Sequence, residues 1–317
     1  MGRFLLRRGL QAVPLLVGIS ILAFALLQAI PGDPTVAYYG TSSVRAEDLA
    51  RIREQLGLDR PLPIQYLSWL GQFVQGDWGV SYVASRPVLD IVLERLPATL
   101  WLMGAALVFS VLLAIPLGLL AAVRQYSWLD YTLTFFSFVG LSLPIFWVGL
   151  MAIVIFSLNL GWFPSGGMGP PGEDPTFGER LRYLALPALT LGLVQVGFFT
   201  RYLRASMLDV LGKDFMRYAR ARGVPPWRLY LRHGFRNAAI PFVTVVAIHI
   251  PDYLIGALVV ETIFSWPGTG RLFWESAVRF DYPVLMGVLV IASLVVVLSN
   301  LLADLVYGVL DPRIRYD

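Results

Sequence analysis

Long stretches without a charged side chain constrain the fold of this chain more than any other feature. Five such stretches are present, and a sixth is uncharged apart from Asp252. An apolar helix of about 18–20 residues is long enough to cross a bilayer. The uncharged stretches are Gly9–Gly32, Leu96–Val123, Tyr131–Trp162, Tyr183–Thr200 and Tyr282–Ala303, and the sixth is Asn237–Val260. The chain is therefore predicted to be an all-α polytopic membrane protein with six transmembrane helices.

Composition agrees with this class, because charged residues make up 15% of the chain, whereas soluble domains average about 25%. The predicted transmembrane helices are 9–31, 97–123, 131–160, 183–203, 237–260 and 283–308. The remaining parts are an N-terminal segment 1–8, an insertion 32–96, a loop 204–236 and a tail 310–317, with 97–309 as the main transmembrane domain.

A cleaved signal peptide is the competing interpretation of the first stretch. The stretch follows Arg3, Arg7 and Arg8, as the apolar part of a signal peptide would. It is longer than a usual signal core, and Leu27-Gln28-Ala29 is a poor cleavage site. A retained helix is therefore favoured.

Basic residues predict the orientation, since cytoplasmic loops of membrane proteins carry an excess of Arg and Lys. The segments on the side of the termini hold 15 basic residues, and those on the opposite side hold 10. Six of these ten lie in 33–95, and a segment of this length crosses the membrane regardless of its charge. Both termini are predicted to be cytoplasmic, and the insertion 32–96 is predicted to be extracytoplasmic.

The insertion mixes both charges and is predicted to fold as a small cap. Ala46–Leu56 and Ile64–Val74 suit helices, and Gly76–Ser81 is a turn-rich strand candidate. Two interpretations fit its aromatic residues Trp69, Trp78 and Tyr82. They form an aromatic belt at the membrane interface, or they bind a partner.

Several classes of function are excluded by what the sequence lacks. It has no cysteine, and its two histidines, His233 and His249, do not have a metal-site spacing. A Walker A loop requires Gly-Lys-Ser/Thr, but the only lysine lies in Gly212-Lys213-Asp214. The chain is predicted to be no enzyme and to bind no metal or cofactor. The basic loops explain its pI of 9.4 without nucleic acid.

The loop 204–236 and its flanks form the most basic part of the chain. Arg201–Arg236 holds nine basic residues against two acids. Two interpretations fit this charge. The arginines orient the chain and contact anionic lipid headgroups, at about 1 kcal/mol each, or the loop docks into a groove of a partner protein.

The same loop is patterned like a hairpin of two helices. Leu208–Arg222 is predicted to be helical and to end at Gly223, because glycine accepts the left-handed conformation after a helix. Pro225 and Pro226 then restart the chain, and Trp227–Asn237 is predicted to form a second short helix. The layout predicts a rigid structure at the membrane surface.

Several stretches, in order along the chain, resemble permease subunits of ATP-binding-cassette importers. Arg217-Tyr-Ala-Arg-Ala-Arg-Gly223 and Leu231-Arg-His-Gly-Phe-Arg-Asn-Ala-Ala-Ile-Pro241 resemble the EAA loop of that family in its dipeptide/oligopeptide/nickel branch. The other matching stretches are Ile30-Pro-Gly-Asp-Pro34, Leu56-Gly-Leu-Asp59, Gly76-Asp-Trp-Gly79, Glu94-Arg-Leu-Pro-Ala-Thr-Leu100, Val260-Glu-Thr-Ile-Phe-Ser-Trp-Pro-Gly268 and Leu310-Asp-Pro-Arg-Ile-Arg315. The insertion after the first helix is similar to that of the first of the two permease subunits in such systems.

This resemblance implies a type I ABC-importer permease fold. The chain would form half of a translocation pathway for di- or oligopeptides or similar small solutes. The implied partners are a second homologous permease, two ATPase subunits that use ATP and Mg²⁺, and an extracytoplasmic substrate-binding protein. The implied location is the cytoplasmic (inner) membrane of a bacterium or archaeon.

In this family the EAA loop inserts a coupling helix into the ATPase subunit. The resemblance assigns this role to Asp214, Phe215, Arg217, Tyr218, Ala219, Arg220, Arg222, Gly223, Arg232 and Pro241. One departure is that Arg217 stands where the wider family has its leading acid, six residues before the glycine. A contact made by that acid is therefore not carried over, whereas Gly223 keeps its role as the bend.

Polar residues inside the predicted spans are candidates for the substrate pathway, because they are costly in a bilayer. His249 and Asp252 lie three residues apart and so share a helix face, and Pro251 between them is predicted to kink the helix. The pair forms a polar patch on the pathway or closes a structural contact. Further candidates are Gln195 and Ser142, which, like Ser137, are also typical of helix packing.

The alternative function is a proton-coupled secondary transporter with His249 and Asp252 as its relay. Such transporters are often built from inverted repeats, and no internal repeat is visible in this sequence. Only the importer requires an ATPase partner, so only the importer gives the basic hairpin a role.

Overall fold

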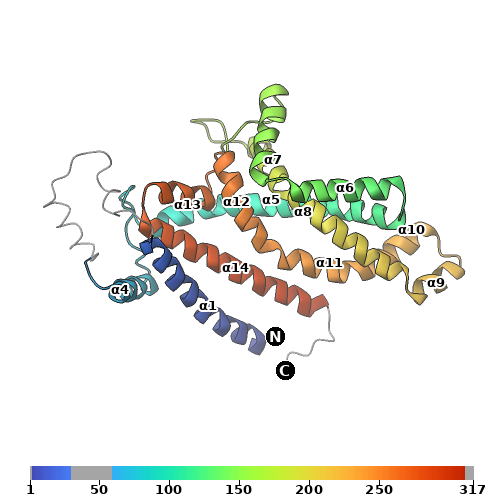
Figure 1. Ribbon diagram of the computed structural model, residues 1–317, viewed down its shortest axis with the longest axis horizontal. Helices are drawn as coiled ribbons and strands as arrows, with labels where there is room; N and C mark the ends of the chain where they lie inside the picture. The colour runs from blue at the N-terminus through green and yellow to red at the C-terminus, as the bar shows by residue number, and fades with distance from the viewer. Residues whose placement is uncertain (1, 30–58, 311–317) are drawn as a thin grey trace. The chain divides into compact units, whose positions relative to one another are not determined.

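The computed structural model describes residues 2–29 and 59–310, which are largely helical and contain no β-strand (Figure 1). In chain order the helices are α1 (Gly2–Ala29), α4 (Leu62–Val74), α5 (Val88–Val123), α6 (Trp128–Ser142), α7 (Ile145–Ala152), the π-helical η1 (Ile153–Asn159), α8 (Phe177–Leu211), α9 (Asp214–Ala221), α10 (Pro226–Arg228), the π-helical η2 (Leu229–Phe235), α11 (Arg236–Ile248), α12 (Ile250–Ile263), α13 (Thr269–Val278) and α14 (Tyr282–Leu310).

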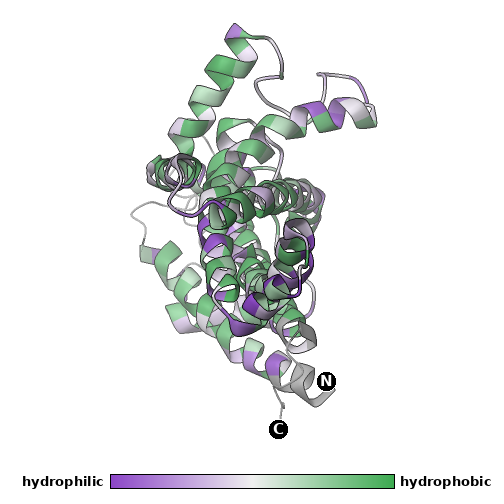
Figure 2. Ribbon diagram, turned by 90° about the vertical axis from the view of Figure 1, so that its right-hand side faces the viewer, coloured by the Kyte–Doolittle hydropathy of each residue, from purple (hydrophilic) through white to green (hydrophobic). Residues whose placement is uncertain are grey.

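Four of the described helices, α1, α5, α8 and α14, are long and apolar enough to cross a membrane. Hydrophobic residues colour most of the length of the long helices (Figure 2). Two bent pairs, α6 with α7–η1 and α10–α11 with α12, raise the number of spans to six when each pair is counted as one. The prediction of an all-α polytopic membrane protein is confirmed.

The helices extend beyond the uncharged ranges of the sequence. α5 begins at Val88 rather than at residue 97, and α8 covers Phe177–Leu211 rather than 183–203. A capping box fixes the start of α8, because Thr176 Oγ1 accepts the Glu179 N–H and the Glu179 carboxylate accepts the Thr176 N–H. Charged residues are compatible with a helix outside the bilayer, so a lack of charge underestimates helix length.

Two predicted spans are broken. The range 131–160 is not one helix, because α6 and the α7–η1 segment meet at an angle of 102°. The break lies at Leu143, which is extended (φ −79°, ψ 131°) because it precedes Pro144 and proline disfavours a helical residue before it. α11 and α12 meet at 46° beside Pro251, which confirms the predicted kink.

The chain divides into two compact units, one of residues 1–99 and 267–297 and the other of residues 100–266 and 298–317. Within the second unit α8 is the central helix, because 61% of its apolar 18-residue stretch is buried. Its glycines allow close approach of the neighbouring backbones. A Cβ on Gly197 would lie 2.6 Å from the Ser137 carbonyl oxygen of α6, and one on Gly192 would lie 2.7 Å from the Phe109 ring of α5.

Within the first unit the start of α14 is central. One apolar cluster joins it to the start of α5 through Val88 and Val284, and another joins it to α1 through Leu27 and Leu285. Asp281, directly before α14, is 3% exposed. Its carboxylate accepts hydrogen bonds from the Ser81 hydroxyl (2.5 Å) and from the backbone N–H groups of Tyr82 (3.1 Å) and Val83 (3.4 Å). We call residues 81–84 the anchored turn.

Part of the predicted insertion can be compared with the structure. α4 confirms the helix predicted over Ile64–Val74, whereas Ala46–Leu56 lies outside the described residues. The strand predicted over Gly76–Ser81 is wrong, because Gly76 (φ +89°) and Gly79 (φ +80°) turn the chain. Only one isolated bridge, from Val80 to Pro87, forms in this segment.

Candidate coupling hairpin and polar pathway

The basic loop folds into a helical hairpin, residues 212–235, which we call the coupling hairpin. α8 ends at its C-cap Gly212, and α9 begins after Lys213, whose backbone is extended (φ −76°, ψ 151°). The single helix predicted over Leu208–Arg222 is therefore wrong, since glycine is a poor helix former and breaks it. α10 begins with Pro226 and continues through η2 into α11, so the separate short helix predicted over Trp227–Asn237 is part of one longer helix. α9 and α10 lie near one end of α8 (Figure 1).

Gly223 closes the hairpin through backbone bonds. Its φ is +75°, a conformation that glycine adopts without strain. The Gly223 N–H donates to the Arg220 carbonyl (3.0 Å), and the Val224 N–H donates to the Ala219 carbonyl (3.3 Å). These are the two bonds of a Schellman motif. The predicted bend is confirmed, and its shape is fixed by the main chain.

Three apolar contacts hold the hairpin in place. Met216 of α9 is 1% exposed and Leu229 is 2% exposed. Gly234 lies against the end of α8, where an added Cβ would come within 3.1 Å of Met207 Cε. α9, η2 and the end of α8 therefore form one packed body rather than a free loop.

The rest of the hairpin surface is exposed, apolar and basic. Its exposed large hydrophobic residues are Phe215, Tyr218, Trp227 and Leu231, and its exposed arginines are Arg217, Arg220, Arg222, Arg228 and Arg232. The only ion pair recorded for these arginines is between Arg217 and Asp214, 3.6 Å apart and highly exposed. Of the other predicted coupling residues, Ala219 is half-buried and Pro241 is exposed within α11.

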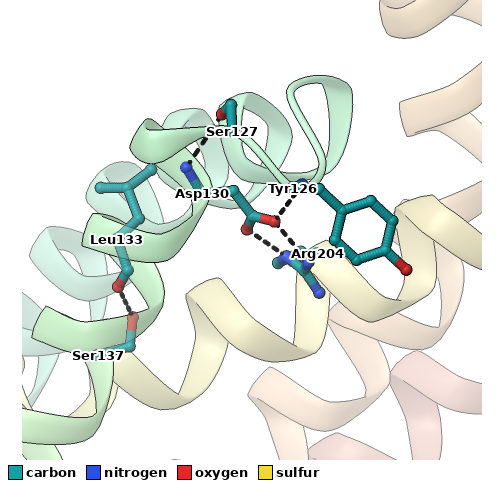
Figure 3. A network of polar contacts seen from close by, with 6 residues as sticks. All are labelled: Tyr126, Ser127, Asp130, Leu133, Ser137 and Arg204. Atoms are coloured by element: carbon teal, nitrogen blue, oxygen red, sulfur yellow. Dashed lines mark hydrogen bonds and ion pairs between the residues drawn. The ribbon is translucent and has the colours of Figure 1, made fainter.

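An ion pair that sequence reasoning missed connects the end of α8 to α6 (Figure 3). Arg204 donates to both carboxylate oxygens of Asp130, with Nε–Oδ1 at 2.6 Å and Nη2–Oδ2 at 2.7 Å. Asp130 is 2% exposed, and it also accepts the Tyr126 N–H at 3.0 Å. A bidentate pair of this kind fixes both position and angle.

The sequence predicts the position of Asp130 at a helix start but not its partner. Ser127, whose Oγ accepts the Asp130 N–H, caps α6 in a Ser-x-x-Asp pattern that predicts a helix start. Arg204 lies 74 residues further along the chain, and no local pattern connects it to Asp130.

The predicted pathway pair does come together. His249 Nδ1 lies 2.6 Å from Asp252 Oδ2, and the two side chains are 30% and 46% exposed. The His249 ring centroid is 4.4 Å from that of Phe198 on α8. The next residue, Tyr253, is buried and hydrogen-bonded to Ser110 of α5. The pair thus lies at the break between α11 and α12, half open to its surroundings.

Neither of the other two pathway candidates is hydrogen-bonded to this pair within the part of the chain that the structure describes. The Ser142 hydroxyl donates to the Phe138 carbonyl of its own helix (2.9 Å), as the Ser137 hydroxyl does to Leu133 (2.7 Å). Such back-bonding is typical of helix packing. Gln195 is half-buried on α8, with no side-chain hydrogen bond recorded to a described residue. The described residues contain no metal-ligand cluster.

Comparison with known proteins identifies the family. Residues 114–316 match the family described as binding-protein-dependent transport system inner membrane component, and residues 1–103 match its N-terminal counterpart. The chain is 44% identical over its full length to the oligopeptide transport system permease protein AppB of Bacillus subtilis, covering 100% of both chains. It is 37% identical to the dipeptide transport system permease protein DppB of Escherichia coli K12, covering 99% of both.

A solved structure supports the fold. The chain is similar to a chain of the MetNI methionine ABC transporter in an inward-facing conformation, with a TM-score of 0.59 and 16% identity. The match covers 70% of this chain and 97% of the other. It shows a type I ABC-importer permease fold.

These findings support a multi-pass transport subunit of the inner membrane, which works with ATPase and substrate-binding partners. They do not support the proton-coupled secondary transporter. The chain belongs to the binding-protein-dependent transport system inner membrane components, the permease subunits of ABC importers.

Proposed function

We propose that this permease forms half of the translocation pathway of an importer for di- or oligopeptides. A second homologous permease forms the other half, and two ATPase subunits drive the pair. The names of the relatives support the substrate class, since AppB is an oligopeptide permease and DppB is a dipeptide permease. An extracytoplasmic binding protein delivers the peptide.

The coupling hairpin is the observation that carries this proposal. Its bend is closed by backbone bonds at Gly223, and its body is held by buried Met216 and Leu229. A hairpin so fixed transmits a push, whereas a flexible loop absorbs it. Its exposed apolar residues and arginines suit a groove with acidic edges on a cytoplasmic ATPase.

The push has a defined route into the bundle. The contact between Gly234 and Met207 joins the hairpin to the end of α8. One helical turn before Met207, Arg204 joins α8 to α6 through Asp130. Closure of the ATPases would therefore move the hairpin, α8 and the start of α6 together and switch the pathway between inward-open and outward-open forms.

In this proposal the chain itself binds no ATP. Lys213 is exposed in the extended link between α8 and α9 and is followed by Asp214, whereas a Walker A lysine is followed by Ser or Thr. ATP and Mg²⁺ are bound by the partner subunits, and this chain contributes the surface on which they dock.

The His249–Asp252 pair supplies a polar patch for the peptide in this proposal. Its two side chains are partly exposed and lie where α11 gives way to α12. Gln195 lies three residues before Phe198, whose ring contacts His249, so it lies on the same side of α8. Ser142 is the weaker candidate because its hydroxyl is already bonded within α6.

The first test concerns the bend and the substrate. Gly223→Pro locks φ near −65° and removes the N–H that bonds to Arg220. We expect the purified four-subunit complex in proteoliposomes to keep its ATPase activity but lose at least about tenfold in uptake of labelled di- and pentapeptides, whereas Gly223→Asn keeps most of it because Asn tolerates positive φ. Normal uptake with Gly223→Pro would overturn the coupling role, and failure of the wild-type complex to transport any peptide would overturn the substrate class.

The second test concerns charge. Arg217→Glu with Arg220→Glu reverses two exposed charges of α9, and we expect the ATPase to separate from the permease during purification. Arg180→Glu with Arg279→Glu reverses two exposed charges predicted to lie on the other side of the membrane and serves as the matched control. Equal ATPase retention by both double variants would contradict the proposed docking surface.

A further inference from the structure

The first unit contains a cavity of about 500 Å³ that the coupling function does not use. It lies between the end of α1, α4, the segment before and within the anchored turn, and the start of α14. Its lining includes aromatic residues, three glutamines, one arginine and one aspartate; they are Phe24, Trp69, Trp78, Tyr82 and Tyr282, then Gln28, Gln65 and Gln72, then Arg60 and Asp77. This volume is in the range of small-molecule sites.

Aromatic residues of the cavity wall belong to a continuous series of ring contacts. Neighbouring ring centroids from Phe24 through Tyr66, Trp69 and Phe73 to Trp78 are 5.6, 5.9, 5.2 and 4.5 Å apart. Tyr66 is further held by a hydrogen bond to Ser20 of α1 at 2.9 Å. Phe24 and Tyr66 lie edge-to-face, and Phe73 and Trp78 are stacked, and rings in these arrangements attract one another. This wall is therefore preformed rather than built around a ligand.

The polar groups of the cavity are also held in place. Gln65 Nε2 donates to the Arg60 carbonyl (2.7 Å), and Gln28 Nε2 donates to Gln65 Oε1 (3.3 Å). Asp77 Oδ1 accepts the Gly79 N–H (2.9 Å). The cavity therefore presents one cation and one anion together with amide and aromatic side chains.

This set of groups matches the chemistry of a short unblocked peptide. A peptide carries an ammonium group at one end and a carboxylate at the other, and a guanidinium pairs with a carboxylate through two parallel hydrogen bonds. Glutamine side chains donate and accept, as the peptide bond does. Aromatic faces accept side chains of many kinds.

We propose that this cavity binds a short zwitterionic peptide, with Arg60 at its carboxylate and Asp77 at its ammonium group. The proposal rests on the proposed peptide transport and on the predicted extracytoplasmic location of the insertion. The cavity is a site of the permease itself, separate from that of the binding protein. A zwitterionic lipid headgroup carries a similar pair of charges but no peptide bonds for the glutamines.

The test is equilibrium binding of labelled Ala-Phe-Ala to the purified complex without binding protein, in nanodiscs of phosphatidylglycerol alone. For the wild type we expect N-acetylation and C-terminal amidation of the peptide each to weaken binding about tenfold, as loss of a charged hydrogen bond does. Asp77→Asn should abolish the effect of acetylation only, and Arg60→Gln that of amidation only. Matched controls are Asp90→Asn and Arg86→Gln, exposed residues of the same unit that do not line this cavity.

Each outcome decides the proposal. Equal binding of free and blocked peptides, or unchanged discrimination in both cavity variants, would overturn it. Loss of peptide binding when phosphatidylethanolamine is added to the nanodiscs, with that lipid retained by the wild type but not by Arg60→Gln in native mass spectrometry, would overturn it in favour of a headgroup site. Uptake of the same peptide in the presence of binding protein distinguishes the proposed transport function from the proposed cavity site. If uptake persists while the cavity fails the binding test, only the cavity site is refuted.

Discussion

The coupling hairpin and the anchored turn are both short connections between helices, but they are held by different bonds. The hairpin is closed by main-chain hydrogen bonds around Gly223 and by buried Met216. The anchored turn has main-chain bonds too, from the Ser81 N–H to the Arg86 carbonyl (2.9 Å) and from the Ser85 N–H to the Ser81 carbonyl (3.0 Å). In addition, the buried carboxylate of Asp281 accepts three hydrogen bonds from it. In the hairpin, main-chain bonds supply much of the stabilisation, so its exposed side chains remain available to a partner. In the anchored turn, three further hydrogen bonds depend on a single buried carboxylate.

The largest effect is expected at that carboxylate. Asp281→Ala would leave the Ser81 hydroxyl and the N–H groups of Tyr82 and Val83 without their acceptor, at a cost of about 4 kcal/mol. We expect a lower thermal midpoint in detergent and faster chymotryptic cleavage after Tyr82, which lies within the anchored turn and is followed by Val83. Asp90→Ala, an exposed acid of the same unit, should change neither. Unaltered cleavage after Tyr82 would show that the turn is held by other contacts.

A second buried carboxylate, Asp130, tests whether the end of α8, next to the coupling hairpin, also depends on a single side chain. Asp130→Ala leaves Arg204, whose side chain is 25% exposed, without its partner. We expect a loss of about 3 kcal/mol, at the lower end for a buried ion pair because Arg204 retains some water. Thermal unfolding measures this loss, with the exposed Asp209→Ala as control. A midpoint equal to that of the control would mean that packing alone holds α6 on α8.

A smaller effect is expected within the backbone-closed hairpin. Gly223→Ala places a Cβ on a residue with φ +75°, which costs about 1 kcal/mol. Gly178→Ala in α8, where a Cβ meets open space, should be neutral or slightly stabilising. Thermal midpoints of the two variants give the comparison. A loss from Gly223→Ala as large as that from Asp281→Ala would remove the distinction between the two connections.

The smallest effect on stability is expected at the pathway pair. His249 and Asp252 are too exposed for their contact to contribute more than about 0.5 kcal/mol. His249→Leu should therefore leave the thermal midpoint almost unchanged while lowering peptide uptake several-fold. Thr244→Val, which removes a hydroxyl bonded within α11, is the control for uptake. A variant that loses stability but transports normally would make the pair structural.

The sequence predicted what depends on local chemistry. Uncharged length located the spans, and Gly223 was placed as the bend because few other residues adopt its conformation. Proline marks both breaks: Pro251 predicts the kink between α11 and α12, and Pro144 accounts for the extended Leu143 between α6 and α7.

The remaining features depend on residues far apart in the chain. Asp130 meets Arg204 across 74 positions, and Asp281 meets the Ser81 hydroxyl across 200. The aromatic cavity joins residues from α1, α4 and α14. Neither the periodicity nor the spacing of residues in the sequence predicts such contacts, because they depend on how whole helices pack. Helix ends such as Thr176 were also missed, since caps rather than hydropathy fix them.

The glycines of α8 have a consequence for how the permease can move. Gly192 and Gly197 bring α8 within reach of Phe109 and the Ser137 backbone, where no added Cβ would fit. Helices meshed this closely can neither roll nor slide past one another without colliding. The helices of the second unit therefore move as rigid bodies. Opening of the pathway requires rotation of the backbone at the breaks between them, which lie at Leu143–Pro144, Gly212–Lys213 and His249.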